Sequence, residues 1–216
     1  YLHEENLPTG SAVIQVNQRG ENCILLYGGA NQTVTEEQIE QTLGNFQPGD
    51  VLIAQNEISQ LPKLLSCAEK RGLRIAWNPS PMNEKITPDM LSSVNWLFVN
   101  EVEAEQLCGS NQPEICLDRL SALCPKGAVI LTLGSAGSCY AGPEGHFFQP
   151  AFSVQAVDTT AAGDTFTGYF LASILKDGVP QSALELASKA SALAVTRKGA
   201  YDSIPWKREV DGTALN

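Results

Sequence analysis

The stretch "AVDTTAAGDTFTGYF", residues 156–170, places small residues, a glycine and an aspartate at the start of an expected helix. The first backbone N–H groups of a helix have no partner within it and form its positive end. Small side chains at Ala161, Ala162 and Gly163 would let an anion such as a phosphate approach these groups. Asp164 either stabilises the positive helix end or takes part in chemistry, and neighbouring segments must decide between these roles.

Strands and helices alternate along most of the chain. An antiparallel hairpin is predicted from "SAVIQVN" and "NCILLYGG", joined by a turn that contains a glycine. Thr35 and Gln38 form the spacing of a capping box ahead of a short helix. Strands are predicted at 50–55, 73–78, 94–100 and 127–134, with further short strands over 138–157, and helices at 36–44, 58–72, about 114–124, 163–176 and 180–197. This alternation predicts an α/β fold with three layers, in which helices cover both faces of a mostly parallel, Rossmann-like sheet.

Composition excludes several classes of partner. The formal net charge of −10 and the lack of a Lys/Arg run disfavour binding to nucleic acid or to an anionic membrane. No apolar stretch approaches the roughly 20 residues that span a bilayer, and the first residues lack the pattern of a signal peptide. We therefore expect a cytoplasmic protein with a small-molecule ligand. We expect reduced core cysteines and surface histidines, namely Cys23, Cys67, Cys108, Cys116, Cys124 and Cys139, with His3 and His146.

Two further segments follow predicted strands and could contact a nucleotide. "TLGSAG", residues 132–137, lies where open α/β sheets bind ligands, yet it matches neither the dinucleotide fingerprint nor the P-loop. Asn100 and Glu103 come three residues apart after another strand, so they share one face of a helix start. They could hold phosphate oxygens and a hydrated magnesium ion, or form an ordinary helix start rich in glutamate.

Together these segments resemble the ribokinase group of the PfkB carbohydrate kinases. The resemblance extends over nearly the whole chain and is carried by "NEVEAE", "TLGSAG", "DTTAAGD" and the run "AVTRKGAYDSIPW" at 194–206. Many members of the broader family have glycine where this chain has Ala161, whereas ribokinase-like members carry alanine there. The resemblance implies a small β lid and dimer clasp within residues 1–30 and a nucleotide-binding kinase domain over 31–216. It also implies that the family's N-terminal sugar-binding segment is missing.

The implied activity is ATP-dependent transfer of the γ-phosphoryl group to a sugar hydroxyl, with D-ribose as the expected sugar and ribose 5-phosphate as the product. Another small sugar or a nucleoside is an alternative substrate. A non-catalytic nucleotide-binding fragment is an alternative function. A nicotinamide enzyme is a further alternative, disfavoured by the missing dinucleotide fingerprint. The resemblance also implies a homodimer.

The resemblance assigns roles to individual residues. Asp164 would be the general base and a contact to the sugar, while the backbone of Ala161, Ala162 and Gly163 would stabilise the transferred phosphoryl group. Glu103 would order magnesium through water, and Glu57 would contact the sugar. The expected nucleotide contacts are Asn100, Thr132, Gly134, Ser135, Gly137 and Gly163, with Ser188 near the adenine.

A monovalent cation, potassium, is expected beside this anion site. The implied oxygen ligands come from Asp158, Thr160, Ala194, Arg197, Gly199 and Ser203. Oxygen ligands suit a hard cation, which would fix the loop before Asp164. The alternative for "TRKGAYDSIP" is a helix end followed by a turn, with Gly199 in the left-handed conformation.

Overall fold

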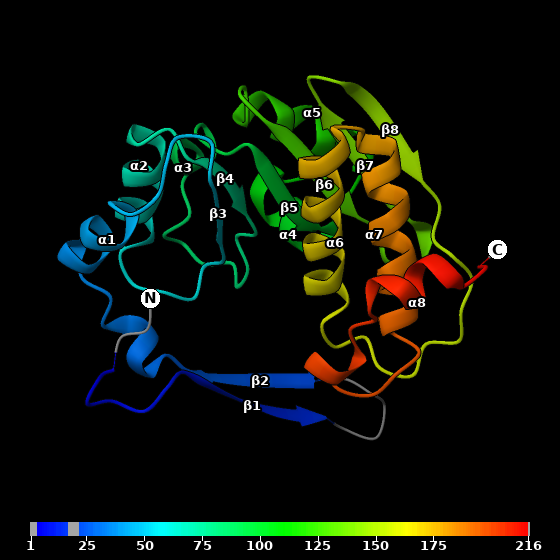
Figure 1. Cartoon of the computed structure of the whole chain (residues 1–216), viewed down its shortest axis with the longest axis horizontal. Coiled ribbons are helices and arrows are strands. Elements are labelled where there is room, and N and C mark those ends of the chain that lie inside the picture. The colour runs from blue at the N-terminus through cyan, green and yellow to red at the C-terminus, as the bar shows by residue number, and fades with distance from the viewer. Residues whose placement is uncertain (1–3, 17–21, 216) are drawn as a thin grey trace. The chain divides into compact units, whose positions relative to one another are not determined.

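The computed structural model describes residues 4–16 and 22–215 (Figure 1). The chain forms two compact units, Tyr1–Asn95 and Trp96–Asn216, and each unit is described here by itself. The division into a lid within residues 1–30 and a kinase domain over 31–216 stays a prediction.

The first unit contains the predicted hairpin and one parallel pair of strands. Strands β1 (Ser11–Val16) and β2 (Asn22–Tyr27) pair antiparallel in a sheet of their own, and the turn between them lies outside the described residues. Thr35 and Gln38 form the predicted capping box, with hydrogen bonds of 2.8 and 3.2 Å. The remaining elements are α1 (Glu36–Leu43), β3 (Val51–Ala54), α2 (Leu61–Lys70), β4 (Arg74–Trp77) and α3 (Pro88–Leu91). Strands β3 and β4 run parallel, as predicted.

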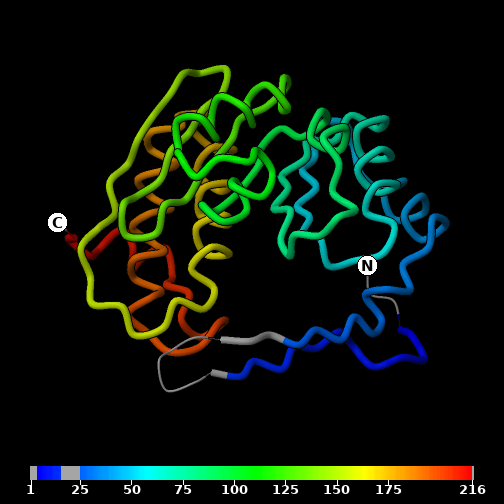
Figure 2. Tube along the Cα trace, turned by 180° about the vertical axis from the view of Figure 1, so that it is seen from behind, coloured from blue at the N-terminus to red at the C-terminus, as the bar shows by residue number. Residues whose placement is uncertain are grey.

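The second unit has three layers. Its strands lie in the order β5-β6-β7-β8, with α6 and α7 on one face and α4 and α5 on the other (Figures 1 and 2). The strands are β5 (Trp96–Asn100), β6 (Ala128–Thr132), β7 (Ser138–Gly142) and β8 (Gly145–Gln149). The helices are α4 (Glu101–Cys108), α5 (Pro113–Leu123), α6 (Ala162–Asp177), α7 (Pro180–Ala194) and α8 (Lys207–Gly212). The predicted α/β fold is therefore confirmed.

The sheet of the second unit is mixed. Strand β5 pairs parallel with β6, whereas β6–β7 and β7–β8 pair antiparallel. Only residues 133–137 connect β6 to β7, and a parallel crossover needs about a dozen residues or more. Residues 150–157, for which further strands were predicted, form an irregular segment that leads from β8 toward α6.

An aromatic cluster fixes α6 against the sheet. Phe170 of α6 is fully buried and lies edge-on to Phe98 of β5, with ring centroids 5.5 Å apart. Tyr140 of β7 stacks on the same ring at 6.3 Å, and Phe166 stacks on it one turn earlier, also at 6.3 Å. Burial of such large rings stabilises the contact between helix and sheet, which sets the position of the α6 N-terminus.

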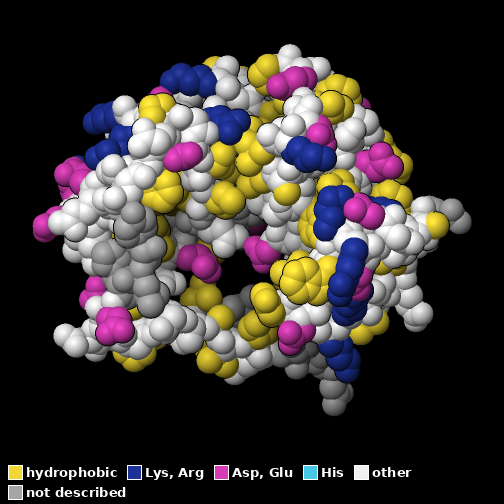
Figure 3. Space-filling model, viewed as in Figure 1, with side chains coloured by type: hydrophobic (Ala, Val, Ile, Leu, Met, Phe, Trp, Pro, Cys, Tyr) yellow, Lys and Arg dark blue, Asp and Glu magenta, His cyan; other side chains and the backbone are white. Residues whose placement is uncertain are grey.

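The face that Figure 3 draws carries charges of both signs. In Figure 3, Lys and Arg side chains are interspersed with Asp and Glu, and the formal net charge is −10. Within residues 4–16 and 22–215, none of the helices combines the length and the apolar character required to cross a bilayer.

Candidate active site

A cavity of about 630 Å³ lies in the second unit, where β5 and β6 end. Asn100 is the last residue of β5 and Thr132 the last of β6, and both line the cavity. The first turn of α6 contributes Ala162 and Gly163 to the same cavity. All of the predicted nucleotide contacts line it, namely Asn100, Thr132, Gly134, Ser135, Gly137, Gly163 and Ser188. Segments far apart in sequence thus form one concave site at the sheet edge that the sequence predicted.

The loop after β6 requires glycine at two positions. Gly134 and Gly137 adopt φ values of 52° and 125°, which L side chains rarely adopt. A Cβ added at Gly137 would overlap the carbonyl oxygen of Gln149, whereas a Cβ at Gly134 would meet no protein atom within 4 Å. A hydrogen bond of 2.8 Å from the Leu133 N–H to the Gly137 carbonyl closes the loop. The loop therefore presents backbone to the cavity with space around Gly134.

Asn100 and Glu103 form a reciprocal cap on α4. The Asn100 Oδ1 accepts a hydrogen bond of 2.9 Å from the Glu103 N–H, and the Glu103 Oε2 accepts one of 3.0 Å from the Asn100 N–H. Glu103 is 7% exposed, while Asn100, Glu101 and Val102 line the cavity. The spacing that suggested a phosphate and magnesium site thus fixes the helix start, and the role of Glu103 toward magnesium stays a prediction.

A strained residue begins α6. Ala161 has φ 59° and ψ 13°, the left-handed conformation, at the N-cap position. This conformation costs an alanine roughly 1–2 kcal/mol. It turns the chain so that Ala162 and Gly163 line the cavity, while Asp164 follows in the first helical turn and is exposed. A Cβ added at Gly163 would meet no protein atom within 4 Å, so space is open beside the positive end of the helix.

Helix α7 supports this turn from the neighbouring position. The Ser191 hydroxyl donates a hydrogen bond of 3.0 Å to the carbonyl oxygen of Ala162, and Ser191 itself lines the cavity. Ser188, one turn earlier on α7, is buried and lies 3.2 Å from the Ser138 hydroxyl on β7. Helix α7 therefore fixes both the first turn of α6 and a second wall of the cavity.

Asp158 connects the segment before α6 to the turn after α7. Its Oδ1 accepts hydrogen bonds from the Thr160 hydroxyl (2.7 Å) and N–H (2.9 Å), and its Oδ2 accepts one of 3.0 Å from the Gly199 N–H. The Thr160 hydroxyl bond, then the two backbone bonds, lower the pKa of this carboxyl to about 2. The Val195 carbonyl also accepts bonds from the Val157 and Asp158 N–H groups. Three predicted cation residues thus lie together.

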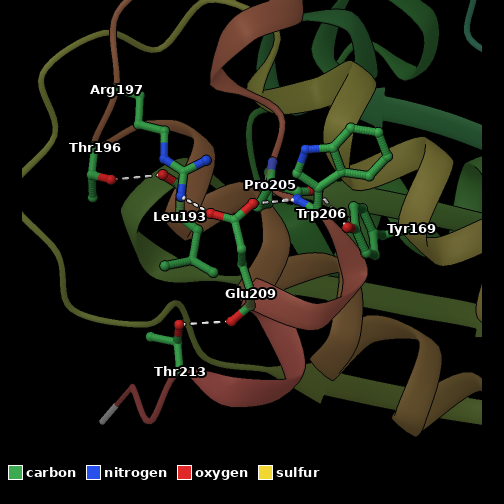
Figure 4. Close-up of polar contacts among 8 residues, drawn as sticks. All are labelled: Tyr169, Leu193, Thr196, Arg197, Pro205, Trp206, Glu209 and Thr213. Atoms are coloured by element: carbon green, nitrogen blue, oxygen red, sulfur yellow. Dashed lines mark hydrogen bonds and ion pairs between the residues drawn. The ribbon is translucent and has the colours of Figure 1, made fainter.

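Helix α8 holds the other end of this turn (Figure 4). The Glu209 Oε1 pairs with the Arg197 guanidinium at 2.7 Å, and its Oε2 accepts a hydrogen bond of 2.7 Å from the Trp206 N–H. The bond from Trp206, then that from Arg197, lower the pKa of Glu209. The Tyr169 hydroxyl of α6 donates to the Pro205 carbonyl at 2.6 Å. One carboxylate of α8 thus fixes both ends of residues 197–206.

Two of the predicted cation residues have local partners in this turn. Ser203 is fully buried, and its hydroxyl donates a hydrogen bond of 2.7 Å to the Ala200 carbonyl. The Ala194 carbonyl accepts the Arg197 N–H at 3.0 Å, while Gly199 has a φ of 93°. The helix end and turn read from the sequence are therefore present.

Several cavity residues were not predicted from the sequence. The irregular segment after β8 supplies Ala151, Phe152, Ser153, Val154 and Ala156, α6 adds Phe166, and α7 with its C-cap residue Val195 adds Ser191 and Ala192. The α7 residues lie three, four and seven positions after Ser188, which is the spacing of one helix face. That spacing is the signal that could have found them, whereas the irregular segment carries no such pattern.

Glu57, the predicted sugar contact, lies in the first unit. It is exposed in the connection between β3 and α2, and its backbone carbonyl accepts a hydrogen bond of 2.8 Å from Gln32. Its contact with a sugar stays a prediction.

Comparison with known proteins identifies the class to which this fold and site belong. The family described as pfkB family carbohydrate kinase matches residues 1–207. The chain is 39% identical to a ribokinase of Schizosaccharomyces pombe over 97% of its own length and 69% of that protein. It is 34% identical to a ribokinase of Haemophilus influenzae, covering 93% of this chain and 67% of the relative.

Solved structures give the same result. The ribokinase of Thermotoga maritima is similar with a TM-score of 0.82 and 33% identity, over 95% of this chain and 69% of that one. The Arabidopsis thaliana ribokinase complexed with ribose and ATP has a TM-score of 0.80 and 28% identity over the same shares. The chain therefore belongs to the PfkB family of carbohydrate kinases, with ribokinase-like structural neighbours, as the sequence motifs indicated.

Replacing Ala161 by glycine tests the strain at the start of α6. Glycine adopts the left-handed conformation without the Cβ penalty but loses more chain entropy, so we expect Ala161→Gly to stabilise the protein by about 0.5–1 kcal/mol. Thermal unfolding should then shift upward by about 2 °C. The matched control Ala162→Gly changes a residue without positive φ at the first position of α6 and should lower stability, by less than the roughly 1 kcal/mol that glycine costs in a helix interior. Equal destabilisation by both changes would contradict strain at Ala161.

Proposed function

We propose that this protein is an ATP-dependent sugar kinase that transfers the γ-phosphoryl group to a hydroxyl of D-ribose, forming ribose 5-phosphate. The observation that carries the proposal is the meeting of the α6 N-terminus with the loops after β5 and β6 around one cavity. This is the arrangement that phosphate binding requires, because backbone N–H groups and glycines face the same space. The similarity to named ribokinases supports ribose as the acceptor.

The cavity suits a nucleoside triphosphate. Glycines and hydroxyl side chains, including Gly134, Ser135 and Ser188, would contact the phosphates and polar edges. Apolar side chains such as Phe166 and Val195 would enclose the base, which is the usual mixture in small-molecule pockets. Asn100 would donate to phosphate oxygens from the end of β5. A magnesium ion held through water by Glu103 would supply charge neutralisation of the phosphates.

Asp164 is the residue that we assign as general base. Its position two residues after the N1 residue of α6 lets it remain in the first helical turn and still face a sugar at the cavity edge. It would accept the proton of the attacking hydroxyl while the backbone at Ala161, Ala162 and Gly163 stabilises charge on the transferred group. Such catalysis depends mainly on positioning and charge stabilisation.

Substitution of Asp164 tests both catalysis and the function. Asp164→Asn keeps the shape but cannot accept a proton, so we expect turnover to fall by about 10² or more. The affinity for ATP, measured by calorimetry, should change little.

Phosphate transfer to D-ribose is to be compared with transfer to 2-deoxy-D-ribose, because a deoxyribokinase of Salmonella typhi is 31% identical. Near-normal turnover in the variant would reject Asp164 as base, and ATP binding without any transfer in the unmodified protein would favour the non-catalytic alternative.

A monovalent cation beside the anion site is the second part of the proposal. Asp158 accepts a hydrogen bond from the Thr160 hydroxyl. It also accepts one from the N–H of Gly199, which lies in the turn after α7. These residues offer carboxylate, hydroxyl and carbonyl oxygens, the donor set that suits potassium. The candidate ligands are Asp158, Thr160, Ala194, Arg197, Gly199 and Ser203. The ion would order the segment that precedes Ala161.

Potassium should therefore raise activity by fixing this segment. We expect higher initial rates when potassium is added to a potassium-free buffer, and a smaller rise with sodium because its radius is smaller. We also expect added potassium to raise the melting temperature without nucleotide. Asp158→Ala should lose both responses. Identical rates and melting temperatures with and without potassium in the unmodified protein would remove the cation site.

The lid hairpin supports a homodimer. Val13 and Leu25 pair across β1 and β2 and are 58% and 57% exposed, and Ile14 and Leu26 on the opposite face are 56% and 59% exposed. Figure 3 shows hydrophobic side chains at the surface along this ribbon. Such exposure on both faces of two strands is typical of an interaction surface. We place the dimer in the cytoplasm.

Light scattering at working concentration tests the dimer. The unmodified protein should have twice the mass of the chain, because burial of the apolar hairpin favours association. Leu25→Asp should shift it toward a monomer, since a charge would be buried in the interface. The control Leu175→Asp changes an exposed leucine on α6 and should leave the mass unchanged. A monomeric unmodified protein would contradict the proposal.

A further inference from the structure

Two cysteines of the second unit lie in direct contact. Cys108 is the last residue of α4, and Cys116 lies in the second turn of α5. Their Sγ atoms are 2.9 Å apart, and both thiols lie near the carbonyl oxygen of Ser110, at 3.7 Å for Cys108 and 2.9 Å for Cys116. A disulfide bond is about 2.05 Å long, so a movement of less than an ångström would allow the bond to form.

The surroundings hold the pair in place. The guanidinium of Arg119, one turn after Cys116, donates a hydrogen bond of 2.7 Å to the Cys108 carbonyl. Gly109 adopts φ 70° and ends α4, so the chain turns directly from Cys108 toward α5. The Cys116 N–H donates a hydrogen bond of 2.9 Å to the Gln112 carbonyl, so the backbone of each cysteine is held independently of its sulfur atom.

The two thiols differ in accessibility. Cys108 is half-buried, whereas Cys116 is 2% exposed. Burial, followed by the hydrogen bond with Cys108, raises the pKa of the Cys116 thiol to about 12, while the nearby Arg119 lowers it. An external reagent therefore meets Cys108 first, and Cys116 reacts second from within the protein.

From this geometry we propose that Cys108 and Cys116 are a reversible redox site, which a low-molecular-weight disulfide converts into a disulfide linking α4 to α5. The Cys108 thiolate attacks one sulfur of the reagent and releases the other half as a thiol. Cys116 then loses its proton and attacks the Cys108 sulfur, which releases the second half as a thiol. The sum is two protein thiols oxidised and one reagent disulfide reduced to two thiols.

The consequence is a link between redox state and the stability of α4. This helix begins at the nucleotide cavity, where Glu101 and Val102 line the wall, and it ends at Cys108. A disulfide here closes a short ring and removes conformational freedom mainly from the unfolded chain. The oxidised protein should therefore resist unfolding more strongly than the reduced one. The sequence alone predicts that all six cysteines are reduced core residues. Only the fold shows that Cys108 and Cys116 lie together.

Peptide mapping tests the site on the unmodified protein. The folded protein is treated with oxidised glutathione, alkylated, and digested with trypsin and a glutamate-specific protease. Cleavage after Glu105, Glu114 and Arg119 places the two cysteines alone on the fragments 106–114 and 115–119. We expect a single species that joins these fragments and separates on reduction. Cys108 found only as a glutathione adduct, or joined to another cysteine, would overturn the proposal.

Thermal unfolding gives a second readout. Oxidation should raise the melting temperature by about 5 °C, and dithiothreitol should reverse the rise. Cys108→Ser, which changes the more accessible partner, should abolish the rise, whereas the matched variant Cys67→Ser, another half-buried cysteine, should keep it. If oxidation still raises the melting temperature of Cys108→Ser, other residues cause the rise and the proposal is wrong. The melting temperature is measured without a kinase assay, so failure of the proposed kinase function would not affect this test.

Discussion

The Asp158 carboxylate connects two segments on which the site depends. It accepts hydrogen bonds from Thr160 on its own loop and from Gly199 on the turn after α7. The N–H groups of Val157 and Asp158 also donate to the Val195 carbonyl, so side-chain and backbone bonds together join the segment before α6 to the end of α7. Because the positive end of α6 follows directly, the position of its first N–H groups depends on this carboxylate.

Packing and a hydrogen bond hold α6, the helix that follows this segment, in place. Phe170 anchors α6 on β5 and β7, and Ser191 of α7 holds the carbonyl of Ala162. These contacts allow Ala161 to remain in a conformation that an alanine adopts only with strain. Strain of this kind persists where the surrounding structure over-determines it, and such positions cluster at functional sites. The left-handed Ala161 thus sets the direction in which α6 begins at the cavity.

The cavity itself follows from sheet topology. Parallel β5 and β6 end at one edge, which places Asn100 beside Thr132. The short antiparallel return into β7 keeps Gly134 and Gly137 at this edge, because no helix intervenes. A longer crossover would have carried these glycines away. Strand direction and connection length together therefore decide which loops can contact a nucleotide.

The sequence by itself determined the fold class and most of the strands and helices. Apolar runs of strand length and the capping spacing at Thr35 are local signals, and the glycines after β6 are required by local backbone geometry. Features that depend on contacts between residues far apart in the sequence were decided by the tertiary structure alone. Examples are the antiparallel β7 and β8, the irregular wall at 150–157, the α8 carboxylate of Glu209 and the contact of Cys108 with Cys116. None of these has a periodic pattern, since each arises only when separate elements pack together.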